Sequence, residues 1–147
     1  AKGDKVLGPL KRYLLNAESV SWPLRILDRV ATKDVEIQIL EEVLGKHEPG
    51  YERDPSKKMQ LLSHLGQLEH DKAPELVAPY LKDMDEGVRY TAAESLVRLG
   101  NADVAVRPLC ELFASPEEES FRLRLRIAEG FADRGWTVPE ELRAGVS

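Results

Sequence analysis

The feature that most constrains the fold of this chain is an apolar stripe on one predicted helix that ends at Gly100. Apolar residues recur there every three or four positions, the spacing of one helix face: Val88, Ala92, Ala93, Leu96 and Leu99. The two small alanines in the middle of the stripe would let a neighbouring helix approach closely. Gly100 is a suitable stop, because glycine readily adopts the left-handed conformation of a helix C-terminus. A single helix cannot cover such a stripe, so the sequence must supply partner helices.

The remainder of the chain also has helical periodicity, and no segment alternates with period two for long enough to indicate a strand. Prolines, glycines and polar clusters divide it into separate helices. The longest break, HEPGYERDPS at 47–56, indicates a surface loop. The predicted helices cover about 4–16, 21–30, 32–45, 55–70, 74–82, 86–99, 103–114, 121–134 and 137–144.

Several predicted helix starts carry capping signals. Ser21 is a predicted N-cap that is followed by a proline in the first turn. Asp85 is the predicted N-cap of the central helix, and its carboxylate or that of Asp83 would reach Arg89 one turn into the helix. The Ser-Pro-Glu-Glu sequence at 115–118 matches a capping box with proline at its first position, which predicts a helix start there.

The predicted helices fall into pairs that align with one another. Gly100 at the end of one second helix corresponds to Gly135 at the end of the next, and Leu81 corresponds to Phe113 in the first helices. The repeat period is roughly 31 to 37 residues, which is typical of solenoids of stacked helices. We therefore predict a single domain over residues 1–147, made of four helix pairs and a C-terminal capping helix. The pairs cover about 5–31, 34–70, 73–100 and 103–135, and the cap covers 137–145.

The clearest repeat, VRYTAAESLVRLGNADVAVRPL, resembles the HEAT repeat, in particular the HEAT-like subgroup of the phycobilin lyases. That subgroup follows the pattern Asp-x-x-x-Val-Arg-x-x-Ala-Ala-x-x-Leu-x-x-Leu-Gly. Asp85 lies one residue off that spacing, and the positions that match are Val88, Arg89, Ala92, Ala93, Leu96, Leu99 and Gly100. The fourth pair keeps Arg124, Ala128, Phe131 and Gly135 at the corresponding places. The resemblance implies an all-α, right-handed α-α superhelix in which Arg89, Arg124 and Asp85 have structural roles.

Composition limits the classes of partner. The chain has 21 basic and 26 acidic residues and a formal net charge of −5, which argues against a general nucleic-acid or anionic-membrane surface. No apolar run reaches membrane-spanning length, and the N-terminus lacks the apolar core of a signal peptide. Cys110 is the only cysteine, which excludes an intramolecular disulfide and indicates a reducing compartment. We expect a cytoplasmic protein, and a monomer.

The residue types that carry catalysis or bind metals do not form a recognisable pattern. His64 and His70 are six positions apart and His47 lies across the predicted loop, so no two share the one-turn spacing of helical metal ligands. Cys110 lies in an apolar helix, and we interpret it as a buried structural thiol. No nucleophile elbow or glycine-rich phosphate loop occurs. We therefore expect no enzyme activity, no bound metal and no cofactor.

The outward surface of the second helices is the predicted partner-binding site. If the pairs stack as in a HEAT solenoid, equivalent residues of these helices line the concave face. Large aromatic side chains there, such as Trp22 and Tyr90, are of the type that anchors protein partners. Trp22 could instead pack onto the first helix, and Arg122 with Arg126 could instead form a solvated basic spot. The candidate site residues are Trp22, Arg25, Met59, Ser63, Tyr90, Glu94, Arg98, Arg122 and Arg126.

The sequence therefore favours a non-catalytic scaffold or adaptor that binds a protein partner along the concave face of a HEAT-like solenoid. This interpretation rests on analogy at the level of the fold, because one repeat fold hosts several roles. Two alternatives stay open. One is an accessory subunit of the phycobilin lyase type, and the other is a nucleic-acid binder that uses a local basic patch. The sequence does not identify the protein partner.

Overall fold

The computed structural model describes residues 4–143, and the chain is helical through most of that range. No residue between 4 and 143 lies in a strand, so the all-α prediction is confirmed. The α-helices are α1 (Asp4–Asn16), α2 (Ser21–Val30), α3 (Lys33–Leu44), α4 (Ser56–Leu65), α5 (Ala73–Val77), α6 (Glu86–Leu99), α7 (Ala102–Ala114) and α8 (Phe121–Arg134). Two 3-10 helices, η1 (Ala78–Lys82) and η2 (Glu140–Leu142), follow α5 and α8.

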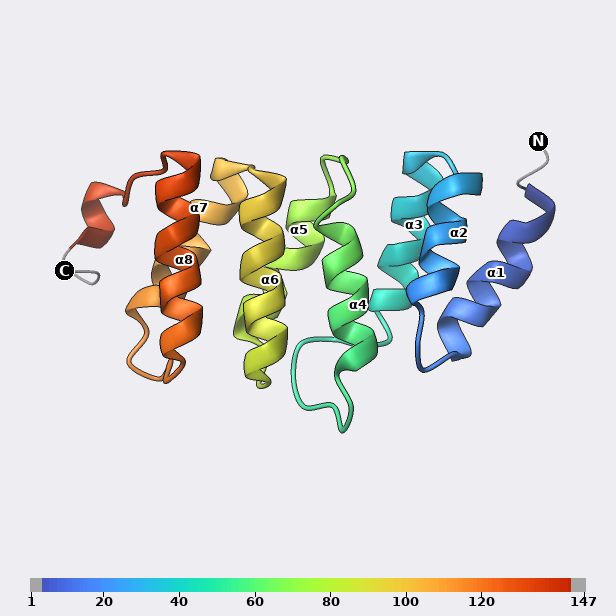
Figure 1. The fold of residues 1–147 in the computed structure, drawn as a ribbon, viewed down its shortest axis with the longest axis horizontal. Coiled ribbons are helices and arrows are strands. Elements are labelled where there is room, and N and C mark those ends of the chain that lie inside the picture. Colours follow the sequence, from blue (N-terminus) through green and yellow to red (C-terminus); the bar gives the residue numbers. More distant parts are fainter. Residues whose placement is uncertain (1–3, 144–147) are drawn as a thin grey trace.

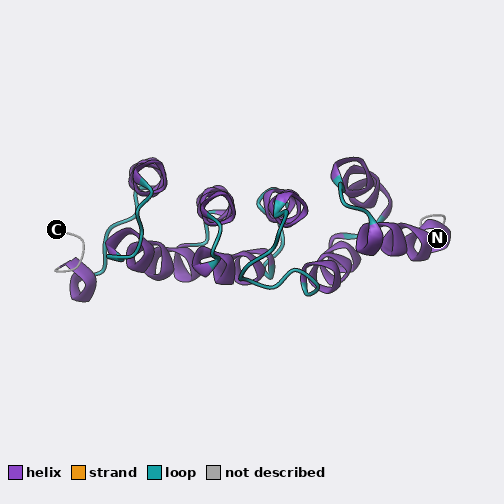
Figure 2. Ribbon diagram, turned by 90° about the horizontal axis from the view of Figure 1, so that it is seen from below, coloured by secondary structure: helices purple, strands orange, loops and turns teal. Residues whose placement is uncertain are grey.

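The helices form two parallel rows, which is the arrangement of a solenoid. Helices α2, α4, α6 and α8 stand side by side in one row, and α1, α3, α5 and α7 form the other (Figure 1). Figure 2 shows the second helices end-on in one row and the first helices in the other row, with loops that connect the two. We call the outer side of this row, formed by α2, α4, α6 and α8, the second-helix face. The stack confirms the predicted solenoid.

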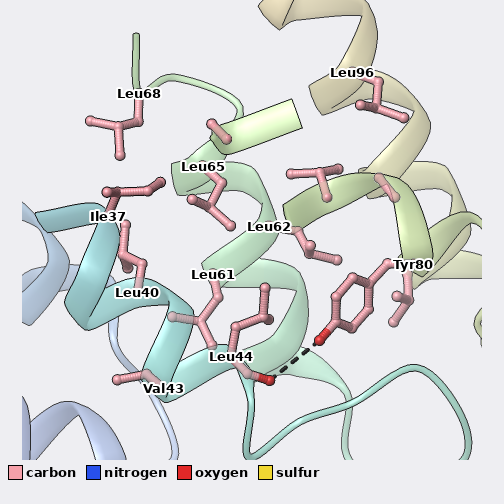
Figure 3. Close-up of a cluster of buried hydrophobic side chains, with 14 of the residues drawn as sticks. Ile37, Leu40, Val43, Leu44, Leu61, Leu62, Leu65, Leu68, Tyr80 and Leu96 are labelled. Carbon is pink, nitrogen blue, oxygen red and sulfur yellow. Dashed lines mark hydrogen bonds between the residues drawn. The ribbon is translucent and has the colours of Figure 1, made fainter. Parts of the chain in front are cut away.

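The core runs between the two rows and through neighbouring pairs. Leu40 of α3 and Leu61 of α4 are fully buried in it, and Leu96 of α6 continues it into the next pair (Figure 3). Tyr80 of η1 is buried as well, and its hydroxyl donates to the carbonyls of Leu44 (3.3 Å) and His47 (2.8 Å). The apolar stripe on α6 is therefore packed against helices of its own and adjacent pairs, as its spacing predicts, and only Leu99 at its end is partly exposed.

The central helix has the caps that its sequence predicts. The Asp85 carboxylate accepts a hydrogen bond from the backbone N–H of Val88 at 3.1 Å, so Asp85 is the N-cap of α6. Gly100 has φ +73° and Gly135 has φ +68°, both in the left-handed region that favours glycine. Each glycine ends the second helix of its pair.

Two of the predicted helix starts are wrong. Ser21 is the first residue of α2 and not its N-cap, since Val20 occupies the cap position without a capping side chain. The backbone N–H of Val20 is instead bound by the Gln60 side chain at 2.8 Å. The Ser-Pro-Glu-Glu segment at 115–118 does not start a helix either. Helix α8 begins six residues after Ser115, and Ser120 is its N-cap, accepting from the N–H of Leu123 at 3.1 Å.

Two predicted helix lengths also need correction. Helix α4 ends at Leu65 and does not reach residue 70, because the chain turns at Gly66 while Leu68 stays buried in the core. The predicted helix over 74–82 is α5 followed by η1, with the break next to Pro79, which has no N–H to continue an α-helix. Of the predicted cap over 137–145, the structure has the short η2, and residues 144 and 145 lie outside the described range.

The second helices touch most closely where glycines face a neighbour. A β-carbon placed on Gly130 of α8 would lie 2.5 Å from Cγ2 of Val97 on α6. One placed on Gly66, at the end of α4, would lie 2.6 Å from Oγ of Ser95. Glycine at these positions lets α6 pack against both α4 and α8, whereas α2 makes its main contacts with α1 and α3.

Candidate functional site

On the second-helix face, α6 and α8 are joined by an ion pair and a stacked arginine. Arg122 donates to both carboxylate oxygens of Glu86, from Nε at 2.8 Å and from Nη2 at 2.6 Å. Its guanidinium lies 4.1 Å from the ring centroid of Tyr90. The hydrogen bond from Arg122 lowers the pKa of Glu86, while partial burial acts in the opposite direction. Tyr90 is therefore a half-buried platform under Arg122 and not a free anchor.

A second group of charges lies one turn further along α6. Glu94 is 3.8 Å from Nε of Arg126 and 4.0 Å from Nη2 of Arg98. Together with the pair of Arg122 and Glu86, these contacts place a carboxylate beside each arginine of the predicted basic spot. The charges on this half of the face are largely paired, so this half does not carry an unbalanced positive patch.

The α2 and α4 half of the face carries the side chains of Trp22 and Met59. Trp22 packs on Tyr13 of α1 with ring centroids 5.1 Å apart, yet 53% of its surface stays exposed. Trp22 therefore packs onto the first helix, as the predicted alternative describes, and still leaves part of its side chain exposed to a partner. Met59 is half-buried, and its side chain covers Gly87 at the start of α6. Arg25 is exposed and Ser63 is half-buried.

Two exposed apolar side chains on α8 lie on this face but outside the set of candidate site residues. Phe121 is 78% exposed and Leu125 is 49% exposed, and they lie four residues apart on one side of the helix. Leu123 and Ile127 are buried on one side of α8. Phe121 and Leu125 alternate with them in the sequence and therefore fall on the opposite, exposed side of the helix, which the sequence pattern alone indicates. They add apolar surface at the C-terminal end of the second-helix face.

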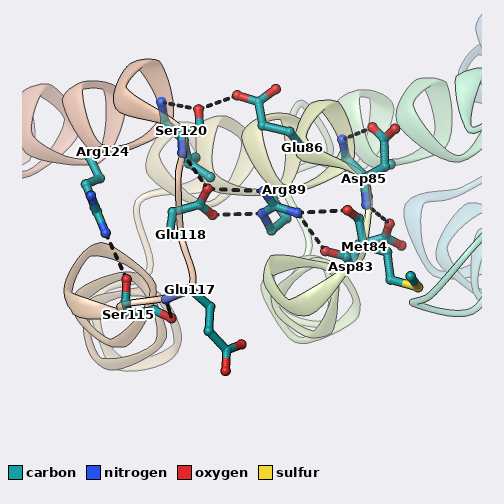
Figure 4. A network of polar contacts seen from close by, with 12 residues as sticks. Asp83, Met84, Asp85, Glu86, Arg89, Ser115, Glu117, Glu118, Ser120 and Arg124 are labelled. Carbon is teal, nitrogen blue, oxygen red and sulfur yellow. Dashed lines mark hydrogen bonds and ion pairs between the residues drawn. The ribbon is translucent and has the colours of Figure 1, made fainter.

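The arginine at the start of α6 ties two loops together at the edge of the stack (Figure 4). Arg89 donates from Nε and Nη2 to the two oxygens of Glu118, at 2.8 Å and 3.1 Å, and from Nη1 to the carbonyls of Asp83 and Met84. Neither predicted carboxylate binds it. The Asp83 carboxylate is used by Lys58 and by the N–H of Asp85, so only the backbone of Asp83 is left for Arg89.

Equivalent cations in the other pairs make comparable contacts. The Lys58 ammonium is buried and binds the carbonyl of Gly50 (3.1 Å) and the carboxylate of Asp83 (2.7 Å). Arg124 donates from Nε to the carbonyl of Phe113 (3.1 Å) and from Nη2 to that of Ser115 (2.8 Å). Each cation thus holds the loop that precedes its own helix, which is a structural role.

The remaining chemically versatile residues are distributed over the molecule. Each of the three histidines pairs with a carboxylate: His47 with Glu52, His64 with Glu36, and His70 with Asp34. Cys110 is buried, and this burial raises the pKa of its thiol, which is the opposite of what a nucleophile needs. The thiol has the environment of a packed core residue.

The arrangement of helix pairs in two rows is typical of helical-repeat proteins, and it places this chain in that class. A family model described as HEAT repeats matches residues 49–128, and the chain belongs to the HEAT-repeat family. The match does not single out the phycobilin lyase type. No curated protein matches the chain. None of the helices described here is both long and apolar enough to cross a membrane.

Proposed function

We propose that this protein is a non-catalytic scaffold that binds a protein partner along the second-helix face. HEAT repeats commonly mediate contacts between proteins, and this family membership supports the general role. The observation that carries the proposal is the exposed apolar surface at both ends of the face, Trp22 on α2 and Leu125 on α8. Large side chains of this type form the anchors of protein interfaces. A reducing cytoplasm, in which Cys110 stays a thiol, suits the protein best.

The paired charges between these two ends support recognition of a particular partner. Glu94 lies on α6, between these two ends, and pairs with Arg98 of its own helix and with Arg126 at the α8 end of the face. Charges fixed in this way favour a partner with a complementary pattern and disfavour others. We therefore expect a partner that presents apolar side chains at two points and charged groups between them.

The test is a binding measurement with the full chain and two matched double variants. Trp22→Ser with Leu125→Ser removes both apolar ends of the face. Tyr51→Ser with Met84→Ser makes the same kind of change at exposed residues on the loop edge of the stack. A partner captured by the wild type should keep its affinity for the loop-edge variant. Its Kd for the face variant should rise by about 30-fold or more, the effect of losing an anchor.

The outcome that contradicts the proposal is equally direct. If the face variant and the loop-edge variant bind every captured partner as the wild type does, the second-helix face is not the binding surface. Circular dichroism of both variants checks that they remain folded, which the exposure of all four residues favours.

A further inference from the structure

Three helices from two neighbouring pairs bring an imidazole and two carboxylates together. Asp28 lies on α2, Glu36 on α3 and His64 on α4, and one oxygen or nitrogen atom of each lies within 4.8 Å of the others. Nε2 of His64 is 2.6 Å from Oε2 of Glu36. These residues are distant along the chain, so the cluster exists only through the stacking of the first pair on the second.

Glu36 is unusual among the buried carboxylates of residues 4–143. Its side chain is 1% exposed, as low as those of Asp83 and Glu118. Asp83 has the ammonium of Lys58 and Glu118 has the guanidinium of Arg89, whereas no lysine or arginine in the described range pairs with Glu36. Its partner is His64, which is positive only when it is protonated. A buried carboxylate is costly unless a cation or a metal ion balances its charge.

The geometry of the cluster suits a small metal ion. Ligand atoms around zinc lie about 2.0–2.2 Å from the metal, which places neighbouring ligand atoms about 3.3 Å apart in a tetrahedral site. The observed separations, from 2.6 Å to within 4.8 Å, bracket that value, so small side-chain rotations would complete the site. Asp28 is exposed and the His64 side chain is 17% exposed, which leaves the cluster open to solvent.

We propose that Asp28, Glu36 and His64 bind one divalent transition-metal ion, with zinc as the best match. One imidazole nitrogen and two carboxylate oxygens, with water in the fourth position, form a ligand set that zinc accepts. Magnesium and calcium prefer sites made of oxygen alone. The ion gives Glu36 a permanently positive partner and ties α2 to α3 and α4. This role is separate from the binding of a protein partner by the second-helix face.

The experiment is a zinc titration of the full chain, first treated with a chelator and then followed by isothermal titration calorimetry. The wild type should bind one Zn²⁺ per chain. Asp28→Asn removes a ligand at an exposed position and should raise the Kd by about 100-fold or more, as should His64→Gln. The matched control is His70→Gln, which removes an imidazole paired with another carboxylate of α3, Asp34, and should leave the Kd unchanged.

Thermal unfolding gives a second readout that does not depend on heat of binding. Zinc should raise the Tm of the wild type and of the His70 variant, but not that of the Asp28→Asn variant. Three results would overturn the proposal: no binding by the wild type, the same Kd for the Asp28→Asn variant and the wild type, or a Mg²⁺ response equal to that of Zn²⁺.

Discussion

Arg89 and Glu118 are 29 positions apart in the chain, yet they form a two-point ion pair between consecutive helix pairs, with distances of 2.8 Å and 3.1 Å. Lys58 and Asp83 form an ion pair with a single contact one pair earlier, at 2.7 Å. In both cases the cation lies near the start of a second helix and the carboxylate lies in the loop before the next one. The second, third and fourth pairs are therefore joined to one another by buried charges as well as by apolar packing.

Arg89→Ala should destabilise the protein by about 3–5 kcal/mol, because it leaves the buried Glu118 carboxylate without its cation. Urea unfolding followed by circular dichroism measures the change. The control is Arg107→Ala, whose partner Glu141 is exposed, and which should cost less than about 1 kcal/mol. Similar losses of stability in the two variants would show that burial of the Arg89–Glu118 ion pair does not increase its contribution to stability.

Acid should weaken the joint between the third and fourth pairs. Burial alone would raise the pKa of Glu118, but the hydrogen bonds from Arg89 and from the N–H of Ser120 outweigh it, so the pKa is lowered from its usual 4.5. A lowered folded-state pKa gives stability that is complete above the usual value and is lost as the pH falls below it.

The pH effect is measured as the urea midpoint between pH 7 and about pH 3.5. The wild type should lose stability over the acid part of this range. The Glu118→Gln variant, which cannot titrate there, should lose less of its own stability between the same two pH values. A parallel decline in both proteins would assign the acid sensitivity to other carboxylates.

Gly130→Ala tests the close contact between α6 and α8. Alanine is the better helix former by about 1 kcal/mol, but its β-carbon would lie 2.5 Å from Val97, which is stiff because it is β-branched. We expect a net loss of about 1–3 kcal/mol from overpacking. In a Val97→Ala background the same change should stabilise the protein, and a double-mutant cycle by urea unfolding measures the reversal.

Gly100→Ala and Gly135→Ala separate backbone strain from crowding. Both glycines are left-handed, so alanine costs about 1–2 kcal/mol at either position. A β-carbon at Gly100 would also lie 2.8 Å from the guanidinium of Arg134, which donates to the carbonyl of Val97, whereas nothing lies within 4 Å at Gly135. Gly100→Ala should therefore lower the Tm more than Gly135→Ala, and equal shifts would exclude a contribution from Arg134.

The sequence predicts the parts of this fold that depend on local chemistry. The stripe of α6 is buried because its spacing follows one helix face, and Asp85 and Gly100 cap that helix through contacts within a few residues. The predicted capping box at 115–118 fails for the opposite reason. Glu118 matches the motif locally, but its carboxylate binds Arg89 from the preceding helix pair. Local pattern does not report such a contact.

The candidate site was predictable only in part. The repeat predicts the second-helix face. The position of the Arg122 guanidinium over the Tyr90 ring depends instead on how α8 is shifted along α6, which the repeat does not specify. The cluster of Asp28, Glu36 and His64 was beyond prediction by spacing along one helix, since each residue comes from a different helix. Spacing along the chain predicts no metal-binding pair of histidines, and it carries no information on contacts between helices.

The unequal joints of the stack have a mechanical consequence. Helix α6 packs closely against α4 and α8, and buried ion pairs stabilise the same two contacts. Helix α2, in contrast, packs mainly against the first helices α1 and α3. Under tension along its long axis, the protein would therefore yield first between the first and second pairs. The other three pairs would move together as one stiff arm, so the molecule would bend at a fixed point.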